Sequence, residues 1–172
     1  MPPSAALVIH TFITSRLDVN NGLLYGVPGY QLYRLQRIQN AAARLLTLLS
    51  PVSNIHITPI LQGLHWLPVH FRIKYKLLLL VFKALHGLAP LYITDLLQLK
   101  QNHHKSLRSN EKSQLETSRG KSLKTYGDKA FQMAAPKLWN AIPVDIKKSI
   151  TVTSFKSKLK TYLFQQAYST VT

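Results

Sequence analysis

The stretch LPVHFRIKYKLLLLVFKALHG, residues 67–87, decides the fold. Its apolar residues recur with the period of an α-helix, which predicts one long helix packed against a core. Gly87 is the expected terminator, because glycine readily adopts the left-handed conformation that follows a helix. The most apolar run, residues 77–82, is far shorter than the ~20 residues that cross a bilayer, so no membrane span is expected. The side chains predicted to face inward are Ile73, Leu77, Leu80, Val81, Ala84 and Leu85.

Helical patterns continue on both sides of this stretch. Upstream, the spacing predicts two short helices between about residues 4 and 25, separated at Asn20-Asn21-Gly22. A long helix follows Pro28-Gly29, and Thr58-Pro59 begins a short one that Gly63 closes. The apolar face of that long helix is predicted to comprise Leu32, Leu35, Ile38, Ala42, Leu45, Leu46 and Leu49.

Downstream, a short helix is expected over residues 91–97. The residues around Pro136 should form two helical pieces joined at Ala135, because the residue before proline avoids the α conformation. Thr153 or Ser154 can cap a final helix. Its predicted inward side chains are Phe155, Leu159, Tyr162 and Leu163, with Lys156, Lys158 and Lys160 facing outward. The predicted fold class is therefore mostly α.

Composition suggests three parts. Residues 1–98 are expected to form a bundle-like helical lobe. Residues 99–121 are nearly devoid of apolar side chains and are predicted to be a basic flexible linker. Residues 122–172 then form a small, basic helical lobe.

Charge is the unusual feature of the composition. The chain has 22 Lys and Arg against 6 Asp and Glu, a net charge of +16, which favours a polyanionic partner. The six carboxylates are too few and too scattered for a two-metal site, and the chain has no cysteine. The histidine spacing matches no zinc site, and the single glycines form no phosphate loop. We therefore expect a non-enzyme with no cofactor and no bound metal.

The basic side chains are the candidate binding residues. They recur along predicted helix faces, where arginine can contact phosphate in a bidentate manner and lysine acts as a point charge. A charged helix face is often only solvated, but such a surface usually mixes both signs. The candidate nucleic-acid-binding residues are Arg34, Arg37, Arg44, Arg72, Lys76, Lys83, Arg108, Lys121, Lys124, Tyr126, Lys129, Lys137, Lys156 and Lys160.

Aromatic residues are interleaved with these cations. Tyr126, Phe131 and Trp139 could form a platform on which bases stack. The competing interpretation, which we favour for Phe131 and Trp139, is that they are core residues at helical spacing. Trp66 is expected to anchor a loop by plugging the core.

Several strings, taken in order, resemble one family. They are residues 10–18 (HTFITSRLD) with 24–26 (LYG), 35–45 (LQRIQNAAARL), 56–59 (HITP), 64–69 (LHWLPV), 75–76 (YK), 82–90 (FKALHGLAP), 107–109 (LRS), 123–131 (LKTYGDKAF), 134–140 (AAPKLWN) and 155–160 (FKSKLK). Together they resemble the region after the catalytic palm in reverse transcriptases of non-LTR (LINE-type, jockey-like) retrotransposons. The resemblance runs from about residue 7 to 165.

The resemblance implies a thumb-like fragment of an RNA-directed DNA polymerase. The palm, with its metal-binding aspartates, would lie upstream, so activity is not implied. The expected function is non-catalytic, sequence-nonspecific binding of RNA or DNA through the phosphate backbone, with a separate reverse transcriptase polypeptide as a further partner. The expected location is intracellular, nuclear or cytoplasmic. Alternatives are a helical protein–protein interaction module, or a non-functional relic of the element.

Overall fold

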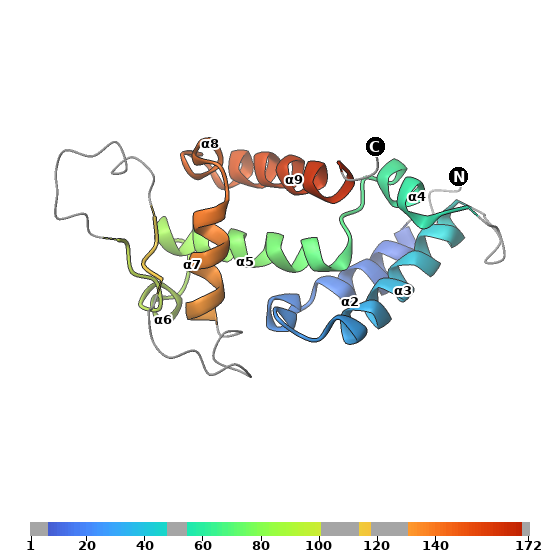
Figure 1. The fold of residues 1–172 in the computed structure, drawn as a ribbon, viewed down its shortest axis with the longest axis horizontal. Coiled ribbons are helices and arrows are strands. Elements are labelled where there is room, and N and C mark those ends of the chain that lie inside the picture. Colours follow the sequence, from blue (N-terminus) through green and yellow to red (C-terminus); the bar gives the residue numbers. More distant parts are fainter. Residues whose placement is uncertain (1–6, 48–54, 101–113, 118–130, 170–172) are drawn as a thin grey trace. The chain divides into compact units, whose positions relative to one another are not determined.

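The computed structural model describes residues 7–47, 55–100, 114–117 and 131–169, and it is mostly helical, which confirms the predicted fold class (Figure 1). The elements in chain order are the π-helix η1 (His10–Thr14), α2 (Ser15–Asp18), the 3-10 helix η2 (Asn21–Leu24), α3 (Gly29–Leu46), α4 (Ile57–Gly63), α5 (Val69–Leu85), α6 (Leu91–Thr94), α7 (Phe131–Ala141), α8 (Val144–Lys147) and α9 (Val152–Tyr168). Leu99 and Leu115 form an isolated antiparallel bridge.

The chain divides into two compact units. Unit 1 comprises Met1–Ile73 and Thr161–Thr172, and unit 2 comprises Lys74–Lys160. Helices α5 and α9 each have one end in either unit, so these boundaries differ from the lobes predicted to meet around residues 99–121. Composition identifies polar segments, but it does not reveal that a long helix contributes its two ends to different packing units.

The predicted linker is described only in part. Residues 101–113 and 118–121 lie outside the described residues. Leu115, within the same predicted linker, is 1% exposed, and the side-chain amide of Asn140 bonds both of its backbone groups. The Leu115 backbone N–H donates to Oδ1 at 2.9 Å, and Nδ2 donates to the Leu115 carbonyl at 2.8 Å. This part of the segment is therefore packed and hydrogen-bonded.

Unit 1 is organised around α3, which packs against α4 and η1 (Figure 1). Its buried residues are Gln39, Ala42, Ala43 and Leu46, whereas the predicted core residues Ile38 and Leu45 are 49% and 63% exposed. The apolar periodicity therefore identified the helix and two of its buried residues, Ala42 and Leu46, but it missed Gln39 and Ala43 and wrongly placed Ile38 and Leu45 in the core. The two small alanines allow close packing, and Gln39 can be buried because its amide is hydrogen-bonded.

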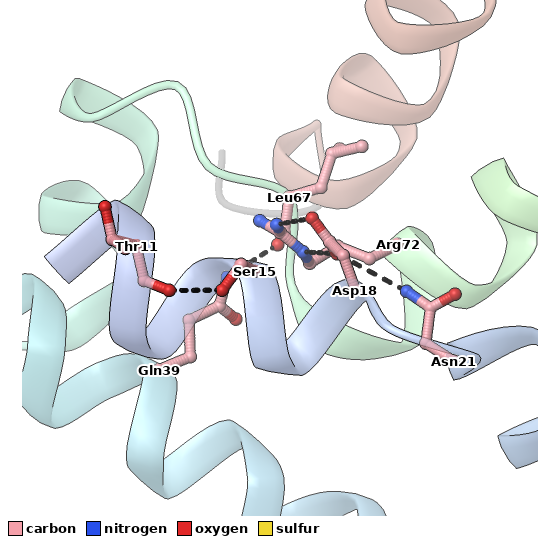
Figure 2. Close-up of polar contacts among 7 residues, drawn as sticks. All are labelled: Thr11, Ser15, Asp18, Asn21, Gln39, Leu67 and Arg72. Atoms are coloured by element: carbon pink, nitrogen blue, oxygen red, sulfur yellow. Dashed lines mark hydrogen bonds and ion pairs between the residues drawn. The ribbon is translucent and has the colours of Figure 1, made fainter. Parts of the chain in front are cut away.

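Glutamines of α3 hold the loop that precedes α5. Gln39 Nε2 donates to the Leu67 carbonyl at 2.9 Å, as Figure 2 shows. Gln36 Oε1 accepts from the backbone N–H of Val69, the first residue of α5, at 2.9 Å, and Gln36 Nε2 donates to Gln39 Oε1 at 3.0 Å. Because the first N–H groups of a helix have no partner within it, Gln36 caps α5 from another helix.

The C-terminal ends of α5 and α4 can be compared with the terminators that the sequence predicted. At the end of α5, Gly87 has φ of 68°, and Leu88 N–H bonds Lys83 O at 2.8 Å, which is the terminator that the sequence predicted. After α4 the same geometry occurs at His65, with φ of 56°, and Trp66 N–H bonds Leu61 O at 2.9 Å. The helix therefore ends at Gly63, as the sequence predicted, but the left-handed residue that follows it is a histidine.

Three other helix boundaries differ from expectation. His56 caps α4, since its Nδ1 accepts from the N–H of Thr58 at 3.3 Å. The hydroxyl of Thr151 accepts from the N–H of Ser154 at 3.1 Å, so α9 begins before the predicted caps. Pro136 lies inside the single helix α7, so the predicted break at Ala135 is wrong. Burial of Ala134, Ala135 and Pro136 offsets the hydrogen bond that proline cannot make.

The core of unit 2 is built on aromatic rings. Phe82 of α5 and Phe155 of α9 are 0% exposed and stack with ring centroids 4.1 Å apart. Trp139 of α7 is 1% exposed, and its ring centroid lies 6.0 Å from that of Phe155. Of the inward positions predicted on these two helices, Leu77, Val81, Ala84, Phe155 and Leu159 are buried in unit 2, and Ile73 and Leu163, which belong to unit 1, are buried as well. Leu80, Leu85 and Tyr162, also predicted to face inward, are half-buried.

Tyr168 fastens the end of α9 within unit 1. It is 8% exposed, and its hydroxyl donates to the carbonyl of Trp66 in the loop between α4 and α5. Burial raises the pKa of Tyr168 from 10.0 to about 12. The neutral phenol is therefore the form that the folded protein stabilises.

We expect the stability of the protein to fall between pH 10 and 12 in a manner that depends on Tyr168. In this window the unfolded chain loses the phenol proton while the folded protein keeps it, so the free energy of unfolding decreases as the pH rises toward 12. Tyr168→Phe removes this titration. When the melting temperatures of both proteins are measured from pH 8 to 12, that of the wild type should fall more steeply above pH 10 than that of the variant. Parallel curves would contradict the assignment.

Candidate nucleic-acid interface

The two units carry different kinds of positive charge. Unit 1 contains five arginines, no lysine and the single carboxylate of Asp18. The described residues of unit 2 contain ten lysines and no arginine, against Asp95, Glu116 and Asp145. Guanidinium groups bind phosphate in a planar, bidentate manner, whereas ammonium groups act as compact point charges. Unit 1 is thus the better candidate for fixed phosphate contacts, and unit 2 for a diffuse cationic surface.

Helix α3 presents two of the predicted arginines to solvent together with two tyrosines. Tyr30, Tyr33, Arg34 and Arg37 are all exposed, the two tyrosines by 67% and 64%. Their offsets of three, four and seven residues place them on one side of the helix. We call these four residues the arginine–tyrosine face. Within the described part of the chain, neither guanidinium has an ion-pair or hydrogen-bond partner.

Two other predicted arginines are engaged inside unit 1. Arg72 pairs with Asp18, its Nε at 2.8 Å from Oδ1 and its Nη2 at 2.5 Å from Oδ2 (Figure 2). The side chain of Arg72 is 13% exposed, so its charge is largely compensated and withdrawn from solvent. Arg44 Nη2 donates to the carbonyl of Ile55 at 2.9 Å. Both therefore have structural roles, and of the three arginines of α3 among the candidate binding residues, Arg34 and Arg37 remain candidates for phosphate contacts.

The predicted lysines of unit 2 are distributed over three helices. Lys76 and Lys83 lie on α5, where Lys76 is exposed and Lys83 half-buried. Lys137 of α7 is exposed. Lys156 and Lys160 of α9 are exposed and four residues apart, which puts them on one side of the helix. Lys158 is exposed as well, but it faces another side, and its Nζ lies 3.4 Å from the carbonyl of Asp145.

The remaining predicted residues fall outside the described part of the chain. These are Arg108, Lys121, Lys124, Tyr126 and Lys129.

The aromatic platform suggested by the sequence does not form around Trp139. Trp139 is buried and Phe131 is half-buried, which supports the core interpretation. Trp66 is 8% exposed, packs in the core of unit 1 and lies edge-on to His10, which confirms its expected role as an anchor.

Sequence reasoning missed the two exposed tyrosines of α3. Tyr30 and Tyr33 precede the arginines at helical spacing, and this interleaving of aromatic and cationic residues was the available signal. They remained unassigned because the faces predicted for this helix comprised only its aliphatic residues, from Leu32 onward, and its arginines.

The residues that the structure describes contain no cluster of three or more histidine, aspartate or glutamate side chains arranged to hold a metal ion. None of their helices has the combined length and apolar character that crossing a bilayer requires.

Comparisons with known proteins found no match among protein-family models, curated proteins or solved structures.

Proposed function

We propose that this chain binds RNA or DNA through the phosphate backbone, without reading base sequence at this surface and without catalysis. The observation that carries the proposal is the arginine–tyrosine face, where two guanidinium groups without described partners stand beside two exposed rings. The guanidinium group of arginine can donate two parallel hydrogen bonds to phosphate oxygens. Stacking of bases on aromatic rings contributes about 1–3 kcal/mol of binding free energy per base.

The lysines of unit 2 support the same proposal. Lys76, Lys156 and Lys160 are exposed, and the unit carries few carboxylates to oppose them. Such a surface attracts a polyanion over a distance of about one Debye length, roughly 8 Å at physiological salt. We also propose that the chain descends from the post-palm region of a retrotransposon reverse transcriptase. We propose an intracellular location, where RNA and DNA occur.

Binding should depend strongly on salt. Displacement of counterions from phosphates makes affinity fall steeply as salt rises, by roughly 10²–10⁴ between 50 and 200 mM for six to ten contacts with a single strand. Fluorescence anisotropy with mixed-sequence single-stranded RNA and DNA at these two concentrations measures the effect. Absence of binding at 50 mM salt, or an affinity that does not change with salt, would refute the proposal.

A second candidate function is a protein–protein interaction module. It is favoured by Ile38 and Leu45, which extend the exposed side of α3 with apolar surface. Light scattering tests self-association through this surface. A dimer at micromolar concentration that Ile38→Glu dissociates would support the module, whereas a monomer unaffected by the change would count against self-association.

A further inference from the structure

Unit 2 contains a pocket of about 600 Å³ that the proposed phosphate contacts do not use. It lies between the segment after α6, residues 114–117 and α7. Small-molecule sites in proteins usually have volumes of about 300–1,000 Å³, so this pocket can hold a group the size of a nucleoside. Its lining is mostly polar and includes Gln98, Lys100, Gln114, Glu116, Gln132 and Asn140.

The isolated bridge builds one wall of the pocket. Lys100 N–H bonds Gln114 O at 2.9 Å, and Glu116 N–H bonds Gln98 O at 2.7 Å, on either side of the Leu99–Leu115 pair. Side chains alternate between the two faces of paired strands, so these four residues project together, opposite to the buried Leu115. The amide of Asn140 fixes the Leu115 backbone and thereby holds this wall against α7.

The lining is amide-rich and electrically balanced. Gln98, Gln114 and Gln132 each offer a donor and an acceptor, and no contact within the described residues engages their amides. Lys100 and Glu116 contribute one charge of each sign. In a chain with a net charge of +16, a balanced pocket is poorly suited to a phosphate. Its chemistry suits a neutral group that both donates and accepts hydrogen bonds.

A nucleobase has this chemistry, because its planar edge carries donors and acceptors side by side, and carboxamides pair with such edges in a bidentate manner. Bases of single strands can be splayed out of the stack. We infer that the pocket receives one nucleobase of a bound single strand, so that unit 2 adds base preference to backbone binding. This inference rests on the proposed function and extends it to a second site.

The test compares 12-nucleotide homopolymers of A, C, G and U, and an abasic strand of equal length, by fluorescence anisotropy. The wild-type protein should prefer one homopolymer by about tenfold over the others and over the abasic strand. Gln98→Ala/Gln132→Ala should lose this preference and retain the affinity for the abasic strand. Both glutamines are exposed on the surface of the unit, so the fold should persist.

Two further variants sharpen the comparison. Gln98→Glu keeps the size of the side chain, removes its donor and should also abolish the preference. Gln165→Ala/Gln166→Ala changes two exposed glutamines of α9 that lie outside the pocket. This double variant should keep the wild-type preference for one homopolymer. Equal affinity of the wild type for all five strands, or an unchanged preference in the Gln98 variants, would overturn the inference and leave backbone binding standing. No binding of any strand at low salt would overturn both.

Discussion

Replacing Phe155 by alanine should lower the free energy of unfolding by about 3–5 kcal/mol. Phe155 is 0% exposed, stacks on Phe82 and lies beside Trp139, so truncation removes buried area and leaves a cavity among three rings. Such a loss is a large fraction of the 5–15 kcal/mol by which domains are typically stable. Urea denaturation followed by circular dichroism and tryptophan fluorescence measures it.

The matched control is Phe12→Ala. Phe12 is 69% exposed, so the same truncation should change the free energy of unfolding by less than about 0.5 kcal/mol. Equal effects of the two substitutions would show that the rings of unit 2 do not form the core described here.

The second large effect is expected for Gln39→Leu, which should lower the free energy of unfolding by about 1–3 kcal/mol. Leucine approximates the volume of glutamine, but it leaves the Leu67 carbonyl without its donor and Gln36 Nε2 without one of its acceptors. Gln39 is 1% exposed, so water does not readily replace the lost partner. Thermal and urea unfolding measure the cost.

Gln31→Leu is the control on the same helix. Gln31 is exposed, and its Nε2 contacts only the hydroxyl of Tyr30, at 3.3 Å, in the described structure. This substitution should leave the free energy of unfolding nearly unchanged. If Gln39→Leu proves equally neutral, the glutamine network does not hold the loop before α5.

Much of the helical layout could be predicted from local signals. Residues 67–87 combine apolar periodicity with a glycine terminator, and both act within one helix, so α5 was anticipated closely. The buried face of α3 was anticipated only at Ala42 and Leu46, because burial of Gln39 depends on a carbonyl 28 residues away. Similarly, α7 continues through Pro136 because packing outweighs the local preference of the residue before proline.

The candidate interface was predictable only in part, for a related reason. Charge and spacing indicate which residues a helix exposes, and they correctly predicted the exposure of Arg34 and Arg37. They do not reveal a long-range partner. Asp18 lies 54 residues from Arg72 and Ile55 lies 11 from Arg44, so the sequence did not show that these two guanidinium groups are engaged.

The central claim is that Arg34 and Arg37 contact phosphates. Both are exposed and without described partners, so alanine at both positions should leave the fold intact and weaken binding of all sequences alike. Arg34→Lys/Arg37→Lys is the matched control, because it keeps both charges while removing the bidentate forks.

The most direct measurement is the slope of log affinity against log salt for single-stranded RNA. In the alanine double variant the slope should become less steep by about 0.7 for each arginine, whereas the lysine double variant should keep the wild-type slope with weaker binding. Identical slopes and affinities for all three proteins would contradict the account.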